Sequence, residues 1–109
     1  MTVYLSSTFS LSRIIGRHTI EMHSENIEYV KSLLAQGFTS IVSDKFKAEV
    51  AELQLGMPVR FSRQSVTLWR GDILVVADLP KRLPKWWKRD SEDALKQIPI
   101  DWYIFEFKR

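Results

Sequence analysis

Four cations stand at the two ends of the stretch from Arg60 to Leu83 and could together bind an anionic ligand. Arg60 and Arg63 open the stretch, and Lys81 and Arg82 close it. Guanidinium and ammonium groups bind phosphate oxygens well, so four of them in one place would suit a phosphorylated ligand. The chain must then bring the two ends of this stretch together.

A β-hairpin would do this. Ser65 to Trp69 and Ile73 to Asp78 are rich in β-branched and apolar residues, and the short turn Arg70-Gly71-Asp72 joins them. Gly71 permits the positive backbone angle that such turns often need. We therefore predict two paired antiparallel strands whose outer ends carry the four cations.

Hydroxyl groups form a second candidate site. A predicted first strand, Val3 to Leu5, runs into the serine-rich stretch from Ser6 to Ser12. Such a loop can hold a phosphate or a ribose, although a turn that caps its own backbone explains it as well.

A third candidate is the start of a helix. The apolar run Phe38 to Val42 predicts a strand covered on both faces, and Ser43, Asp44 and Lys45 follow it. A strand that leads into a helix exposes amides at the carboxyl edge of the sheet, where anions bind in many α/β folds. Capping alone explains Ser43 and Asp44 about equally well.

Two histidines and two tryptophans complete the candidates. His18 and His23 flank the predicted strand Thr19 to Met22, and either could be a general base, although surface histidines are more often simply solvated. Trp86 and Trp87 lie among cations and could stack on nucleobases, or could cover the core or a partner subunit. This basic segment also supports an alternative function as a protein- or nucleic-acid-interaction module.

The elements that position these residues predict one small α/β domain with a mixed sheet of about five strands flanked by helices. Predicted helices run from Ser24 to Gly37, from Ser43 to Gly56 and over Ser91 to Lys96. The final strand, Asp101 to Lys108, is apolar on both faces, which predicts an interior position or a dimer interface.

Composition limits the functions that can be expected. A chain of 109 residues forms one domain, and its net charge of +3 mildly favours anionic partners. With no cysteine and two histidines, neither disulfides nor a zinc cluster are expected, so we predict metal-independent chemistry, or none, and no cofactor. The chain has no stretch of eighteen apolar residues and no signal-peptide pattern, so we expect a cytoplasmic protein with no membrane partner.

The order of elements and several short matches resemble the type III anti-CRISPR ring nucleases, small homodimers that bind a cyclic oligoadenylate across the dimer axis. The opening VYLSSTFS is similar to the first strand of that family, SR at 62–63 stands where Asn-Arg is usual, and RL at 82–83 matches a ligand-contacting Arg-Leu pair. The resemblance implies that this chain is a homodimer that binds a cyclic oligoadenylate or a related cyclic nucleotide, and that a nucleic-acid polymer is not its partner. The ligand-binding residues that we expect are Ser7, Ser10, Ser43, Lys45, Arg63, Lys81, Arg82 and Trp86.

The departures from the family bear on catalysis. The family's general-acid histidine falls on Ser43 here, and the acidic residue that follows Arg-Leu is absent. The resemblance therefore implies capture of the messenger in counter-defence, or slow cleavage by attack of a ribose 2′-hydroxyl. If the chain is an enzyme, the catalytic candidates are Ser43, Lys81 and His18.

Overall fold

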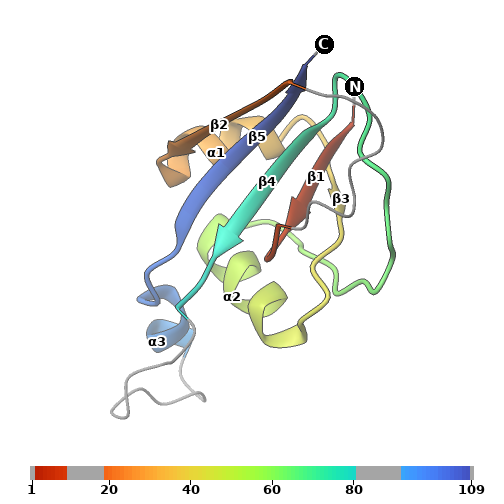
Figure 1. Ribbon diagram of the computed structural model, residues 1–109. Helices are drawn as coiled ribbons and strands as arrows, with labels where there is room; N and C mark the ends of the chain where they lie inside the picture. Colours follow the sequence, from red (N-terminus) through yellow and green to blue (C-terminus); the bar gives the residue numbers. More distant parts are fainter. Residues whose placement is uncertain (1, 10–18, 81–91, 109) are drawn as a thin grey trace.

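The protein folds around one five-stranded sheet with helices on one side of it (Figure 1). The structure is a computed structural model that describes residues 2–9, 19–80 and 92–108. Within these ranges the elements are β1 (Val3–Ser6), β2 (Thr19–Glu25), α1 (Ile27–Leu34), β3 (Thr39–Ser40), α2 (Lys45–Leu55), β4 (Ile73–Asp78), α3 (Glu92–Lys96) and β5 (Asp101–Lys108).

The sheet has the strand order β2-β5-β4-β1-β3 and is mixed, as the sequence predicted. β1 runs parallel to both β3 and β4, whereas β5 runs antiparallel to β4 and β2. The final strand therefore lies inside the sheet, between β4 and β2, which explains why both of its faces are apolar.

The two faces of the sheet are covered differently. On one face Leu5, Val75 and Ile104 pack with buried residues of the helices, such as Val30 and Val50. On the other face the buried residues Leu74, Val76 and Phe107 pack with other strand and loop residues, and no described helix contributes to that cluster. We call this second surface the helix-free face. Figure 1 shows α1 and α2 on the same side of the sheet.

The predicted hairpin over residues 65–78 is wrong. Ile73–Asp78 is a strand, but residues 65–69 form none. β4 cannot pair with them because one of its edges bonds to β1 and the other to β5. Arg60 and Arg63 are therefore not carried to the end of β4 by strand pairing.

The turn that was expected in the hairpin does exist, and a buried carboxylate holds it. Gly71 has a φ of 89°, and Asp72 is 7% exposed. The Asp72 carboxylate accepts hydrogen bonds from the backbone N–H of Trp69 at 2.9 Å and of Thr2 at 3.1 Å. This turn thus connects the amino ends of β1 and β4.

Two helix boundaries follow the predicted caps and one does not. Asp44 caps α2 by accepting from the backbone N–H of Lys47, and Gly56 ends it with a φ of 69°. The first helix begins after Asn26, not at Ser24, because Ser24 pairs with Tyr103 as part of β2. Strand pairing here outweighs the capping tendency of serine.

The predicted strand over residues 38–42 is shorter than expected. Only Thr39–Ser40 is a strand, at the outer edge of the sheet, and Thr39 is exposed. Ile41 and Val42 are nevertheless buried, at 1% exposure each, which accounts for the apolar run without a strand covered on both faces.

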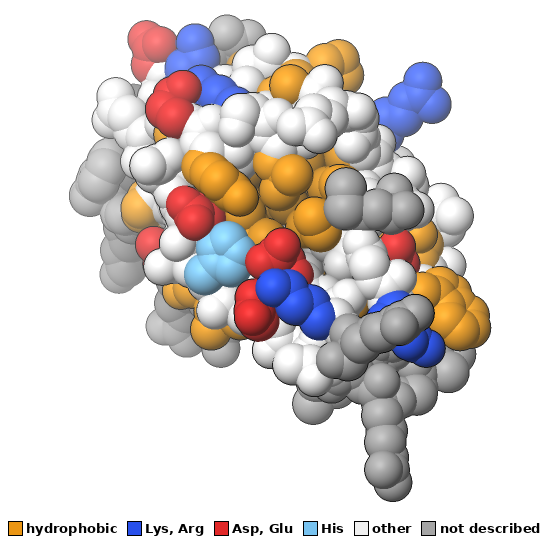
Figure 2. Space-filling model, turned by 90° about the horizontal axis from the view of Figure 1, so that it is seen from above, with side chains coloured by type: hydrophobic (Ala, Val, Ile, Leu, Met, Phe, Trp, Pro, Cys, Tyr) orange, Lys and Arg blue, Asp and Glu red, His pale blue; other side chains and the backbone are white. Residues whose placement is uncertain are grey.

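A group of charged side chains ties the edge strand β2 to β5. Lys108 Nζ lies 2.7 Å from Glu21 Oε2, and His23 contacts Glu25 at 3.0 Å and Glu106 at 3.4 Å. Figure 2 shows a histidine among acidic and basic side chains, next to a group of hydrophobic ones.

In the described part of the chain, no helix has both the length and the apolar character that crossing a bilayer requires.

Candidate functional site

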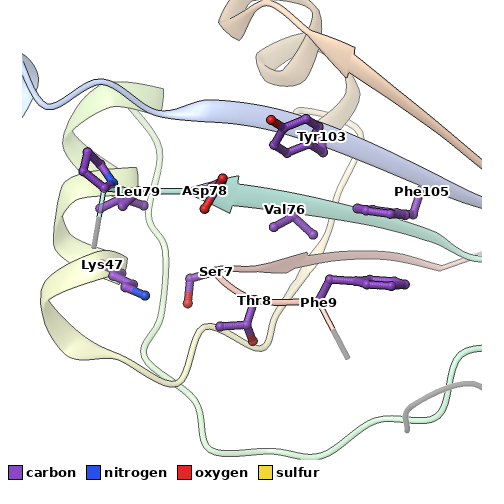
Figure 3. A pocket seen from close by; sticks show the side chains of 10 residues that line it. Ser7, Thr8, Phe9, Lys47, Val76, Asp78, Leu79, Tyr103 and Phe105 are labelled. Carbon is purple, nitrogen blue, oxygen red and sulfur yellow. The ribbon is translucent and has the colours of Figure 1, made fainter. Parts of the chain in front are cut away.

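The carboxyl ends of β1 and β4, which are parallel neighbours, meet at one edge of the sheet beside the first turn of α2. A pocket with a volume of about 540 Å³ opens there (Figure 3). We call it the carboxyl-edge pocket. Its lining residues are Ser7, Thr8, Phe9, Lys47, Val76, Asp78, Leu79, Pro80, Tyr103 and Phe105.

Ser7 is presented to the pocket by the way the chain leaves β1. The Ser6 hydroxyl donates to the Thr8 carbonyl at 2.8 Å and accepts from the Thr8 N–H at 3.2 Å, which fixes a tight turn around Ser7. Ser7 itself is 8% exposed, and no described residue hydrogen-bonds to its hydroxyl. Because buried polar groups normally have partners, this hydroxyl is suited to bind a ligand.

The cation of the pocket is Lys47, which comes from α2. Asp44 begins that helix, and the cap bond at 3.1 Å to the Lys47 N–H sets the orientation of the first turn. In Figure 3 the amine end of Lys47 is directed towards the side of the pocket formed by Ser7 and Thr8. An ammonium group beside two hydroxyls can neutralise and bind an anion such as a phosphate.

Aromatic rings from β5 and from the loop after β1 form another side of the pocket. The rings of Phe9 and Phe105 stack with centroids 4.2 Å apart and planes within 6°. Tyr103 is partly exposed two residues along the same face of β5. Such a surface offers apolar contact to a flat ring.

Asp78 is the acidic group of the pocket. It ends β4, is exposed, and lies in Figure 3 between Tyr103 and the side that carries Lys47 and Ser7. No described residue forms an ion pair or a hydrogen bond with its carboxylate. The pocket thus combines a cation, a carboxylate, hydroxyls and an aromatic side.

The residues predicted from the sequence divide into three groups. Ser7 lies in the pocket, whereas Ser43 is exposed and does not line it. Lys45 and Arg63 lie elsewhere, where each places its charge near the ring of Phe61, at 5.4 and 5.6 Å from the ring centroid. The remaining predicted site residues lie outside the described residues; they are Ser10, His18, Lys81, Arg82 and Trp86.

Arg60 lines a separate, larger hollow of about 890 Å³ near β3. Among the described residues that line this hollow, Arg60 is the one with a charge, and it is exposed. His23, which is engaged by Glu25 and Glu106, lines neither hollow. Across the described ranges, no cluster of three or more side chains could hold a metal ion.

Sequence reasoning missed Lys47 and Asp78, although both had a signal. Asp78 is the polar residue that ends a buried strand, which is where ligands meet parallel sheets. Lys47 lies in the first turn of the helix whose cap was predicted correctly. What the sequence lacked was the pairing of β1 with β4, which brings these two residues to the same pocket as Ser7.

Comparison with known proteins agrees with this fold. A family described as STIV B116-like matches residues 3–103. The structure is similar to that of B116 of Sulfolobus turreted icosahedral virus, with a TM-score of 0.77 and 19% sequence identity over 97% of this chain and 99% of that one. A search of curated proteins found no match. The chain belongs to the STIV B116-like family.

Proposed function

We propose that this member of the STIV B116-like family binds a cyclic oligoadenylate, or a related cyclic nucleotide, and sequesters it in counter-defence against type III CRISPR signalling. The proposal rests on one observation about Ser7. This residue is 8% exposed, its hydroxyl has no described hydrogen-bond partner, and it lines a pocket together with Lys47. The resemblance of the sequence to ring nucleases implied a ligand contact at this same serine.

The components of the pocket match those of a nucleotide. Lys47, Ser7 and Thr8 suit a phosphate, because an ammonium and hydroxyls bind its oxygens with charge-assisted hydrogen bonds. The aromatic side with Phe105 and Tyr103 suits a base, because stacking on an aromatic ring tolerates any nucleobase.

Capture is favoured over cleavage in this proposal because the described part of the pocket contains no histidine. Ser43, which stands where ring nucleases have their general-acid histidine, is exposed and outside the pocket lining. A slow reaction driven by the geometry of a bound 2′-hydroxyl remains the enzymatic form of the same proposal.

The proposal includes a homodimer that forms through the helix-free face. Met22 is 57% exposed and pairs with Phe105, which is itself only partly covered, so this face presents apolar surface to solvent. A second copy would cover that surface. Met22→Lys should convert the protein from dimer to monomer in sedimentation velocity runs, whereas a wild-type protein that sediments as a monomer contradicts this part of the proposal.

The test of binding is direct. Purified protein is incubated with cyclic oligoadenylates, passed through a desalting column and denatured, and the released nucleotide is chromatographed. We expect intact cyclic ligand from the wild-type protein; linear product would indicate cleavage, and no retained nucleotide would contradict the proposal.

Two variants and one control locate the binding. Ser7→Ala removes the hydroxyl with little change in volume, and Lys47→Ala removes the cation, so each should weaken retention by about tenfold or more. Lys96→Ala removes an exposed cation on α3 that does not line the pocket and should leave retention unchanged. Equal retention by all four proteins would place the ligand elsewhere.

A further inference from the structure

The carboxylate of Asp78 has no evident role in stabilising the fold. It stands directly opposite Asp101 in the β4–β5 pair, and both residues are exposed. Like charges that face one another across two strands destabilise a sheet. No described cation or hydrogen-bond donor contacts the Asp78 carboxylate, so Asp78 does not stabilise the fold through such a contact. Binding of a ligand would explain why this carboxylate lies in the pocket.

The chemistry of the carboxylate restricts what it can bind. An ionised carboxylate only accepts hydrogen bonds, and it repels a phosphate. Of the three parts of a nucleotide, the phosphate therefore belongs near Lys47, and Asp78 must face a donor on the sugar or on the base. The lining residues next to Asp78 along the chain, Val76, Leu79 and Pro80, have apolar side chains, and Asp78 is the one carboxylate among the described lining residues.

The order in which the charged and aromatic residues line the pocket indicates that Asp78 faces the sugar of a nucleotide. Figure 3 shows Asp78 between the side that carries Lys47 and Ser7 and the ring of Tyr103. A nucleotide has the same order, with its ribose between the phosphate and the base. An acidic residue at the end of a parallel strand also accepts from ribose hydroxyls in dinucleotide-binding folds, which shows that the arrangement is chemically sound.

We propose that Asp78 accepts a hydrogen bond from a ribose 2′-hydroxyl and thereby makes the pocket select ribonucleotides over deoxyribonucleotides. The inference rests on the proposed function. In a ring of 3′,5′-linked nucleotides the 3′ and 5′ oxygens are esterified, so the 2′-hydroxyl is the only sugar group that can donate. A hydrogen bond from a hydroxyl to a charged acceptor is strong, and its loss on deoxygenation leaves the carboxylate desolvated without a donor.

The experiment compares two probes, cyclic tetra-adenylate and its fully 2′-deoxygenated analogue, by calorimetric titration. We expect the wild-type protein to bind the ribonucleotide about 10 to 100 times more tightly than the deoxy analogue. Asp78→Asn should lose most of this preference. Lys47→Ala should instead weaken the binding of both probes by a similar factor, because both probes have the same phosphates.

Asp101→Asn is the matched control, because it makes the same change directly across from Asp78 and should keep the preference. Neither substitution should lower the melting temperature, since each relieves the repulsion between the two carboxylates. The assignment to the 2′-hydroxyl is overturned if Asp78→Asn keeps the full preference for the ribonucleotide. It is also overturned if Asp78→Asn weakens the binding of both probes equally, as the loss of a contact to the base would. Failure of the wild-type protein to bind either probe overturns the proposed function together with the inference.

Discussion

Replacing Asp72 with alanine should destabilise the protein by about 3 kcal/mol. The carboxylate is 7% exposed and accepts backbone N–H groups of Trp69 and Thr2 at 2.9 and 3.1 Å. A hydrogen bond to a charged acceptor contributes about 1.5 to 3 kcal/mol. Because Thr2 and Trp69 are exposed, water can bind the freed N–H groups, so we take about 1.5 kcal/mol for each of the two bonds.

The loss is large relative to the free energy of unfolding of a domain, which is typically about 5 to 15 kcal/mol. Urea denaturation followed by circular dichroism at pH 7 measures it as a lower midpoint with an unchanged slope. In thermal denaturation we expect a melting temperature lower by roughly 10 to 15 °C.

Two further variants make the measurement specific. Asp72→Asn keeps one carbonyl oxygen as an acceptor and should cost about half as much as Asp72→Ala. Asp93→Ala removes an exposed carboxylate on α3 and should change the free energy of unfolding by less than about 0.5 kcal/mol. If Asp72→Ala behaves like Asp93→Ala, the carboxylate does not hold the turn and our account of the connection between β1 and β4 fails.

Three other predictions test the fold. Ile104→Ala, in the interior strand β5 at 1% exposure, should cost about 2 to 5 kcal/mol in the same urea assay, and a cost below about 1 kcal/mol would contradict its place in the core. Gly56→Ala meets no atom within 4 Å but must keep a φ of 69°, so it should cost about 1 to 2 kcal/mol, and a stabilised variant would refute the left-handed cap. The hydrogen bond to Lys108 lowers the pKa of Glu21, and the same bond raises the pKa of Lys108. The stability difference between wild type and Glu21→Gln should therefore be present at neutral pH and should shrink in high salt. It should be lost in acid as the pH falls through the lowered pKa of Glu21, and in base as the pH rises through the raised pKa of Lys108. A difference that is independent of pH and salt would be inconsistent with an ion pair.

Local signals in the sequence were sufficient for several elements. Asp44 and Gly56 have the side chain and the backbone freedom that helix ends need, so the limits of α2 were predictable from neighbouring residues alone. The run of apolar and aromatic residues over Asp101–Lys108, apolar on both faces, likewise predicted that strand. These features depend on interactions within a few residues.

The hairpin failed because strand pairing is not a local property. Residues 65–69 have the composition of a strand, but the bonding edges of β4 are taken by β1 and β5, which are distant in the sequence. The same competition moved the start of α1 from Ser24 to Asn26, because Ser24 bonds within the sheet.

The sequence by itself determined that this chain is one small α/β domain, that Ser7 leaves a first strand, and that a capped helix follows Asp44. Only the tertiary structure decided that β1 and β4 are neighbours, and hence that Ser7, Lys47 and Asp78 share one pocket while Lys45 and Arg63 meet over Phe61. The physical reason is that a site is made of side chains from segments far apart in the sequence, here from Ser7 to Phe105, and their proximity follows from which strand edges pair.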